Sequence, residues 1–182
     1  MAARKISILL LFGLIASGVM TLVIFGAWQA GPAAYVGWPL WLGRSLVILL
    51  AAIAAAIEKR SRNGILNFQS ALRIASGVMV MAIVVQTLIY WLIPNVIDPH
   101  FYQRLVPVLL EKTQNDYRAI GVPEDQIRPV LEDIRTHNQF SLGRMIQGTG
   151  PLLLIFGIIA VLIAVTVRSK MASTPKPETY NT

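Results

Sequence analysis

The chain has no cysteine, only two histidines, and few charged residues for its length of 182 residues. Without thiols it can form neither a disulfide bond nor a thiolate metal site, and it has no cysteine nucleophile. It also has no glycine-rich loop of the kind that binds phosphate, and its serine, histidine and aspartate residues stand in no motif that would create a nucleophile. These absences predict that the protein is not an enzyme and that it holds no metal ion and no cofactor.

Apolar residues are abundant instead: they make up 55% of the chain, and the mean hydropathy is +0.61. They gather in four stretches, at 6–28, 38–57, 74–93 and 148–167. A helix rises ~1.5 Å per residue, so about 20 apolar residues cross the ~30 Å hydrocarbon layer of a bilayer. The pattern predicts an all-α polytopic membrane protein with four transmembrane helices. Residues 1–170 are expected to form one membrane domain, and residues 171–182 a disordered cytoplasmic tail.

The first apolar stretch follows Arg4 and Lys5 and contains small residues, as a secretory signal peptide would. It is longer than the roughly 7–15 apolar residues of a signal peptide, because it continues through Val23, Ile24 and Phe25. We therefore expect an uncleaved first span.

The net charge of +7 is distributed unevenly along the chain. When the segments between spans are assigned alternately to two sides, charges balance on one side and the whole excess falls on the other. The positive-inside rule makes the basic side cytoplasmic, which places both termini inside and the long segment after the third span outside. All four tryptophans lie at the outer ends of the spans, where this residue prefers to be. Topology thus accounts for the charge, and we expect no nucleic-acid binding. The basic residues of the cytoplasmic side are Arg4, Lys5, Lys59, Arg60, Arg62, Arg73, Arg168, Lys170 and Lys176.

The long external segment, residues 98–140, carries the signals of two amphipathic helices. Asp98 can cap a helix that begins at Pro99, and apolar residues then recur at helical spacing until Gly121. Pro123 precedes a second helix that has acidic residues in its first turn, which suits the helix dipole. The segment is predicted to form an extracytoplasmic helical hairpin over the outer ends of the spans.

Two prolines, Pro107 and Pro129, stand inside these two helices. Proline removes a backbone hydrogen bond and crowds the preceding turn, so we expect kinks or short breaks at both positions.

Two short segments give the chain a family resemblance: residues 97–101 (IDPHF) follow the third span, and residues 121–127 (GVPEDQI) precede the last one, with a charged helix between them. The chain resembles a family of small bacterial four-span membrane proteins catalogued as a domain of unknown function. The resemblance covers nearly the whole chain. It implies a multi-pass protein of the bacterial inner membrane, and it carries over no site residues.

Four polar residues near the outer ends of the spans are candidates for interaction or packing: Arg44, Gln86, Asp98 and Arg144. An ionised group is costly in hydrocarbon, so Arg44 and Arg144 are expected to reach the headgroups or a hairpin carboxylate; the alternative is an anion or substrate site. Gln86 lies within the third span, where an amide that faces lipid would lack a partner. We expect it to bond to another helix, and a pore-lining or substrate-binding role is the alternative.

The two histidines, His100 and His137, could form a divalent-metal site with the carboxylates of Asp98, Glu132 and Asp133. Their spacing matches no recognised ligand pattern, so we expect histidines that are solvated or locally bonded.

Small residues at four-residue spacing, such as Gly13 with Ser17 and Ala51 with Ala55, predict close packing between the spans, with a dimer face as the alternative. Two short segments also recur: IASGVM at 15–20 and 74–79, and LGR at 42–44 and 142–144. The recurrence reflects either a parallel duplication or chance in a restricted alphabet. The copies lie at different depths in their spans, which favours chance.

The expected function is that of an integral membrane protein without enzymatic activity. We expect an accessory or scaffold subunit in the lipid bilayer, whose external hairpin and packing faces contact a membrane-protein partner or a second copy in a homo-oligomer. The alternative is a small oligomeric channel or transporter with a path lined by Gln86, Ser76 and Arg44. A lipid-modifying enzyme would need carboxylates or histidines clustered at one interface, and the sequence has no such cluster.

Overall fold

The computed structural model describes the backbone of residues 2–168 and the side chains of residues 8–168. This part of the chain is helical and contains no strand. Its elements, in chain order, are α1 (Ala2–Ala30), α2 (Pro32–Tyr35), α3 (Pro39–Ser61), α4 (Phe68–Leu92), the π-helical turn η1 (Ile93–Ile97), α5 (Pro99–Ala119), α6 (Glu124–Thr136) and α7 (Leu142–Val167). The tail predicted at 171–182 lies outside the described residues.

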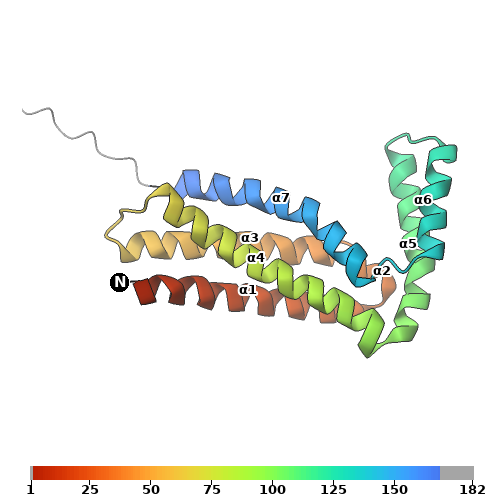
Figure 1. Ribbon diagram of the computed structural model, residues 1–182, viewed down its shortest axis with the longest axis horizontal. Helices are drawn as coiled ribbons and strands as arrows, with labels where there is room; N and C mark the ends of the chain where they lie inside the picture. The colour runs from red at the N-terminus through yellow and green to blue at the C-terminus, as the bar shows by residue number, and fades with distance from the viewer. Residues whose placement is uncertain (1, 169–182) are drawn as a thin grey trace, which may run out of the picture.

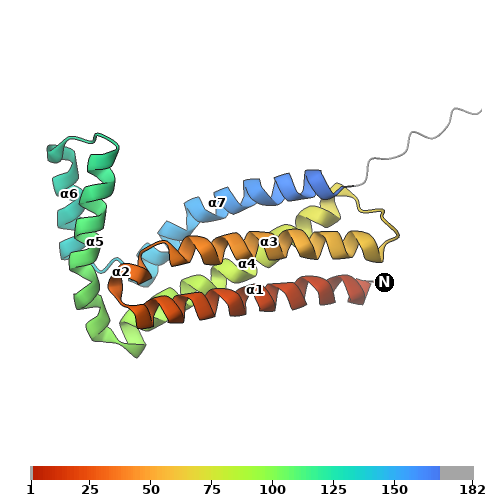
Figure 2. The same cartoon turned by 180° about the vertical axis from the view of Figure 1, so that it is seen from behind.

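Four helical segments are long and apolar enough to cross a membrane, which confirms the predicted all-α class. Their helices α1, α3, α4 and α7 run side by side along the molecule (Figures 1 and 2). The apolar segments extend over Pro32–Ser61 and Phe68–Ile97, because α2 leads into α3 and η1 prolongs α4. The connection between α1 and α3 therefore contains one helical turn, α2.

Helix α4 is the centre of the bundle, and it packs against α1, α3 and α7. Small residues allow the close approach. Gly13 of α1 lies against Met81, and a Cβ at Gly77 of α4 would lie 2.6 Å from Leu9 Cδ1. Ala51 and Ala55 are fully buried in α3. These small residues therefore pack inside the molecule, as predicted, and van der Waals contact is the main attraction between helices in lipid.

Three helices begin earlier than the apolar stretches that predicted them. Helix α1 starts at Ala2 rather than at 6, α4 at Phe68 rather than at 74, and α7 at Leu142 rather than at 148. The start of α4 is set by Asn67, whose side-chain oxygen accepts a hydrogen bond of 2.9 Å from the backbone N–H of Ser70. Hydropathy marks where a helix enters hydrocarbon, whereas the helix itself begins at its cap, in the more polar zone outside.

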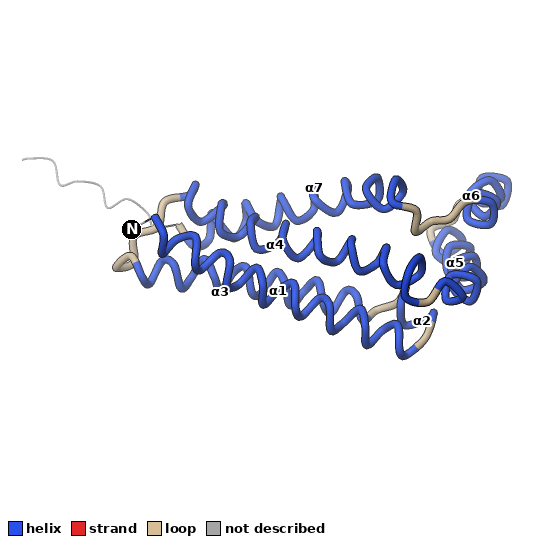
Figure 3. The backbone as a smooth tube through the Cα atoms, turned by 60° about the horizontal axis from the view of Figure 1, so that its bottom comes forward, coloured by secondary structure: helices blue, strands red, loops and turns tan. Residues whose placement is uncertain are grey.

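Helices α5 and α6 form the predicted hairpin, which lies across one end of the bundle and extends past α7 (Figures 1 and 3). Asp98 caps α5 as predicted, because its Oδ1 accepts a hydrogen bond of 3.0 Å from the backbone N–H of Phe101. Helix α5 ends where Gly121 takes a φ of 78°, and the N–H of Val122 bonds back to the carbonyl of Tyr117 at 3.1 Å. This is the usual glycine-terminated helix end.

The breaks predicted at Pro107 and Pro129 are absent, because α5 and α6 each continue through their proline. Both prolines are on the exposed side of the hairpin. There the carbonyl that loses its helical partner can be reached by water, so one missing hydrogen bond does not end the helix.

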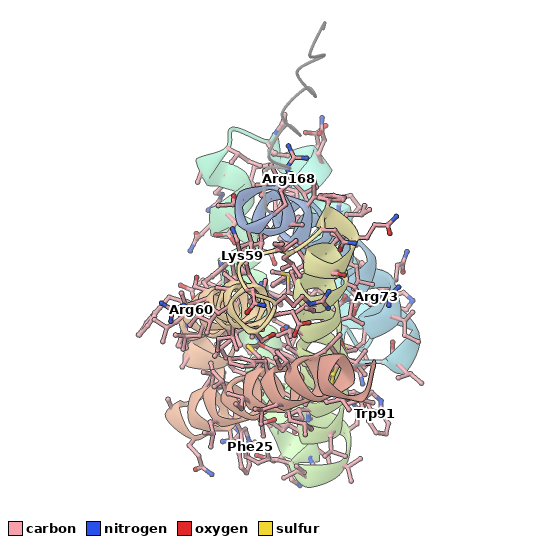
Figure 4. The ribbon with its side chains drawn as sticks, turned by 90° about the vertical axis from the view of Figure 1, so that its left-hand side faces the viewer. Phe25, Lys59, Arg60, Arg73, Trp91 and Arg168 are labelled. Carbon is pink, nitrogen blue, oxygen red and sulfur yellow. The ribbon has the colours of Figure 1, made fainter. Side chains whose placement is uncertain are left out.

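The two ends of the bundle differ in composition. The end covered by α5 and α6, here called the hairpin end, holds the last turn of α1, the first turns of α3 and the last turn of α4. The tryptophans of these turns are Trp28, Trp38, Trp41 and Trp91. The opposite end, here called the basic end, is viewed in Figure 4. Its described basic residues are Lys59, Arg60, Arg62, Arg73 and Arg168.

The helix arrangement does not have the symmetry that a parallel duplication would give. Such a duplication would relate α1 to α4 and α3 to α7, so the contact between α3 and α4 would recur between α7 and α1. No Cα of α7 lies within 8 Å of a Cα of α1 in the described part of the chain. The recurring glycines also differ, since Gly77 packs on Leu9 whereas a Cβ at Gly18 would meet nothing within 4 Å. The arrangement agrees with chance recurrence.

Candidate functional site

A cavity of about 600 Å³ lies at the hairpin end, between α3, α4 and α7, with further walls from α2 and the loop before α7. It is open to the surface of the bundle. Three of the four candidate residues line it: Arg44 from α3, Gln86 from α4 and Arg144 from α7. Sites for small molecules are typically about 300–1,000 Å³, so the volume suits a small ligand or a headgroup.

Arg44 has no negatively charged partner among the residues that the structure describes. Its guanidinium carbon lies 5.0 Å from the centre of the Trp41 ring, one turn earlier on the same helix. Its Nε is buried and donates no hydrogen bond. Within the described chain no carboxylate oxygen lies within 4.0 Å of its nitrogens. Of the two partners expected for Arg44, the headgroups or a hairpin carboxylate, the carboxylate is therefore absent. Arg44 thus contributes one uncompensated positive charge to the cavity.

Gln86 has a buried side chain, only 7% exposed, that lines the cavity. Its amide makes no side-chain hydrogen bond with any described residue. The interhelical bond predicted for Gln86 is made instead by the next residue, since the hydroxyl of Thr87 lies 3.2 Å from that of Thr149 on α7. The packing of α4 on α7 thus leaves the Gln86 amide without a protein partner at the cavity.

Arg144, in the first turn of α7, is held by α6. Its Nη2 donates to Oδ1 of Asp133 at 2.7 Å, and its Nη1 donates to Oδ2 of the same carboxylate. Gln139 Oε1 accepts a further hydrogen bond from Nη1 at 3.2 Å. Two parallel hydrogen bonds make this the strong form of ion pair, and the pairing expected for Arg144 is present. By donating them, the Arg144 guanidinium lowers the pKa of Asp133 to about 2.

An aromatic cluster joins the hairpin to the bundle beside the cavity. Its members are Tyr35 of α2, Tyr90 of α4, Phe101 of α5 and Phe140 before α7. The hydroxyl of Tyr90 donates to the carbonyl of Tyr35 at 2.9 Å, and that of Tyr35 to the carbonyl of Tyr90 at 3.4 Å. The ring centres of Tyr35 and Phe101 are 5.0 Å apart. Buried aromatic rings with bonded hydroxyls hold their elements rigidly, so the cluster fixes the shape of the cavity wall.

Asp98, the fourth candidate, lies outside the cavity and has a structural role. Its Oδ1 caps α5, and its Oδ2 accepts a hydrogen bond from Arg104 Nη2 at 2.6 Å. His137 Nδ1 lies 3.1 Å from Oδ1 of Asp133, so it is locally bonded. No group of three His, Cys, Asp or Glu that could hold a metal ion occurs in the described chain.

The sequence did not single out Gln139 and Phe140, which line the cavity from the loop before α7. No signal in the sequence marks them, because the interface preference of aromatic residues holds for tryptophan and tyrosine and not for phenylalanine. The spacing of Trp41 and Arg44, three residues apart on a helix, does indicate that the two side chains can meet.

The fold and the cavity define a small all-α protein with four segments able to cross a membrane and a polar cavity at the end covered by its hairpin. The chain belongs to the family described as "Protein of unknown function (DUF4199)", whose model matches residues 8–169. This confirms the family resemblance predicted from residues 97–101 and 121–127. No curated protein and no solved structure matches the chain.

Proposed function

We propose that the protein is a non-enzymatic accessory protein of the membrane, which binds a small ligand or headgroup in the cavity at its hairpin end. One observation carries the proposal: Arg44 and Gln86 both line this cavity, and neither has a hydrogen-bonding partner among the described residues. The Nε of Arg44 is buried and unpaired, and a buried polar group without a partner costs about 1–3 kcal/mol. The amide of Gln86 reaches the open cavity, although the side chain is only 7% exposed. A cavity with a guanidinium and an amide that both lack protein partners is suited to a ligand that bonds to both.

The chemistry of the lining supports binding rather than catalysis. The described residues that line the cavity include two arginines, three glutamines and two threonines, but no carboxylate and no histidine. General acid–base catalysis depends mainly on such groups, and nucleophilic catalysis needs a base beside the nucleophile. The polar groups present can hold and orient a ligand.

Transport through an oligomer, the alternative function, receives less support from the cavity. Two residues of the expected path, Arg44 and Gln86, line it, but Ser76 does not. The hydroxyl of Ser76 donates to the carbonyl of Leu72 at 2.7 Å, within its own helix. Between Gln86 and the basic end, the core of α4 is filled by buried Met79 and other apolar side chains. This packing closes a path through a single chain, so transport would need a path between the copies of an oligomer.

The accessory role also needs a partner, and we propose the hairpin as the contact surface. Helices α5 and α6 extend past α7 (Figures 1 and 2). In the described chain α6 packs closely on α5, and its link to α7 is the ion pair between Asp133 and Arg144. The hairpin is therefore available to a membrane-protein partner or to a second copy of the chain.

The proposal places the hairpin end on the outside of the membrane, because the excess of basic residues lies at the other end. Since the chain has no cysteine, single cysteines can test this. We expect Asn115→Cys, on α5, to react with a membrane-impermeant maleimide on intact cells, and Ser61→Cys to react only after lysis. The reverse pattern would overturn the orientation.

The binding role can be tested by purifying the protein from native membranes in mild detergent and identifying small molecules that remain bound. We expect the wild-type chain to retain a ligand near one per protein. Gln86→Leu should weaken the affinity about tenfold, since each 1.4 kcal/mol is a factor of ten, and should therefore retain clearly less ligand. Gln126→Leu, on the exposed side of α6, is the matched control and should leave it unchanged. A wild-type protein that retains no ligand, or a Gln86→Leu variant that retains as much, would contradict the proposal.

A further inference from the structure

We propose that the ligand of this cavity is a membrane lipid whose headgroup carries a single negative charge on a phosphodiester and no positive charge. This inference rests on the proposed binding function and names the ligand class. It follows from the charges, the free donors and the apolar walls of the cavity.

The charge of the cavity calls for one negative charge on the ligand. The cavity has two guanidinium groups. The Arg144 guanidinium is neutralised by the two carboxylate oxygens of Asp133. The Arg44 guanidinium has no carboxylate within 4.0 Å in the described chain. A phosphodiester carries one negative charge, which matches this single uncompensated cation, whereas a phosphomonoester carries about 1.5 to 2 at neutral pH.

The free donors suit phosphate oxygens. Arginine presents its N–H groups in a planar fork that matches two oxygens of a phosphate group, and no carboxylate oxygen of the described chain pairs with the guanidinium of Arg44. The Gln86 amide, only 7% exposed, can donate to a headgroup oxygen through its nitrogen and accept from a headgroup hydroxyl through its oxygen. An uncharged polar headgroup beyond the phosphate would use both functions.

The remaining walls suit an amphiphile at the membrane interface. Trp41, whose ring lies under the Arg44 guanidinium, is 66% exposed on the outside of the bundle, and such a tryptophan marks the headgroup level. Leu152 of α7 lines the cavity about two turns deeper in the span than Arg144. A headgroup bound at Arg44 would therefore have its acyl chains beside apolar residues of α3 and α7.

The experiment measures lipid adducts of the full chain by native mass spectrometry in detergent. Phosphatidylglycerol is the anionic phosphodiester probe, phosphatidylcholine is the probe with an added positive charge, and glycerophosphoglycerol is the headgroup without acyl chains. We expect phosphatidylglycerol to bind at least tenfold more tightly than phosphatidylcholine, and glycerophosphoglycerol not to displace it at equal concentration.

Substitutions connect the selectivity to the residue. Arg44→Gln should weaken phosphatidylglycerol binding at least tenfold, and Arg44→Lys, which keeps the charge but loses the fork, should weaken it about threefold. Arg118→Gln removes the same charge from the hairpin, outside the cavity lining, and should leave binding unchanged. The helical circular dichroism of each variant shows whether it is folded. If Arg44→Gln does not fold, Arg44→Lys still tests the inference.

The outcomes separate this inference from the proposed function. If both lipids bind equally and only Gln86→Leu abolishes binding, the site takes a neutral ligand, and the inference is overturned while the binding function stands. Displacement by glycerophosphoglycerol at equal concentration would show that the site takes a soluble phosphodiester, and it would overturn the inference that the ligand is a lipid. If all probes bind weakly, and equally so to the wild type and to Gln86→Leu, both the lipid inference and the proposed binding function are overturned.

Discussion

Replacing Gln86 with leucine should make the protein more stable while it loses ligand. The side chain is 7% exposed and has no hydrogen-bonding partner among the described residues. Burying an amide without a partner costs about 1–3 kcal/mol, and leucine fills a similar volume without that cost. The cavity admits water, which offsets part of the penalty, so the expected gain is near the lower limit, about 1 kcal/mol. For a chain of this size that corresponds to a rise of about 2–4 °C in the apparent Tm.

The assay is thermal unfolding of the purified protein in one detergent, followed by intrinsic tryptophan fluorescence, without added ligand. Gln126→Leu is the matched control, and it should stay within about 0.5 kcal/mol of the wild type because its position is exposed. A fall of several degrees in Gln86→Leu would refute the reasoning. It would mean that the amide makes the interhelical hydrogen bond expected from the sequence, and that the cavity has no free amide to offer a ligand.

Three further predictions test the packing and the charges around the cavity. Gly43→Ala should lower the free energy of unfolding by about 1 kcal/mol or more, since its Cβ would lie 2.9 Å from a methionine sulfur. Gly143→Ala, whose Cβ would meet nothing within 4 Å, should be neutral or slightly stabilising. Thermal unfolding in detergent distinguishes the two variants. Carboxyl NMR titration should give Asp133 a pKa of about 2 and show it rising toward 3.8 in Arg144→Gln. Because this pKa is lowered in the folded state, the ion pair stabilises the fold fully above about pH 4 and loses that contribution as the pH falls through about 2. A midpoint of the Asp133 titration near neutral pH would contradict this prediction. Tyr90→Phe removes a hydrogen bond of 2.9 Å to a backbone carbonyl and should lower stability by about 0.5–1.5 kcal/mol in the same unfolding assay; an unchanged Tm would show that this hydroxyl does not help to hold the cluster.

Local features of the chain predicted most of the architecture. Four apolar stretches predicted the four membrane-compatible helices, and Asp98 and Gly121 predicted where α5 begins and ends. These signals act within one or two helical turns, so the rest of the fold does not alter them. Of the kink or short break that the same local reasoning predicted at Pro107, the break is absent, because an exposed helix accommodates the proline.

The partners of the polar residues could not be read from their neighbours in sequence. Arg44 and Arg144 stand in the same LGR context, yet the structure pairs Arg144 with Asp133 and leaves Arg44 without a carboxylate. The difference arises because α6 reaches the first turn of α7, through the loop that joins them, and does not reach α3. An ion pair depends on which helices meet, and that is a property of the packed bundle.

The sequence by itself determined that this is an all-α chain with four segments able to cross a membrane, and that its net positive charge lies at one end of them. Helix periodicity, span length and charge are properties of consecutive residues, and they hold for any packing of the helices. Only the tertiary structure decided that Arg44, Gln86 and Arg144 share one cavity. Helices α3 and α7 have to pack on α4 before these side chains meet, and the same packing decides which of them keep a free donor.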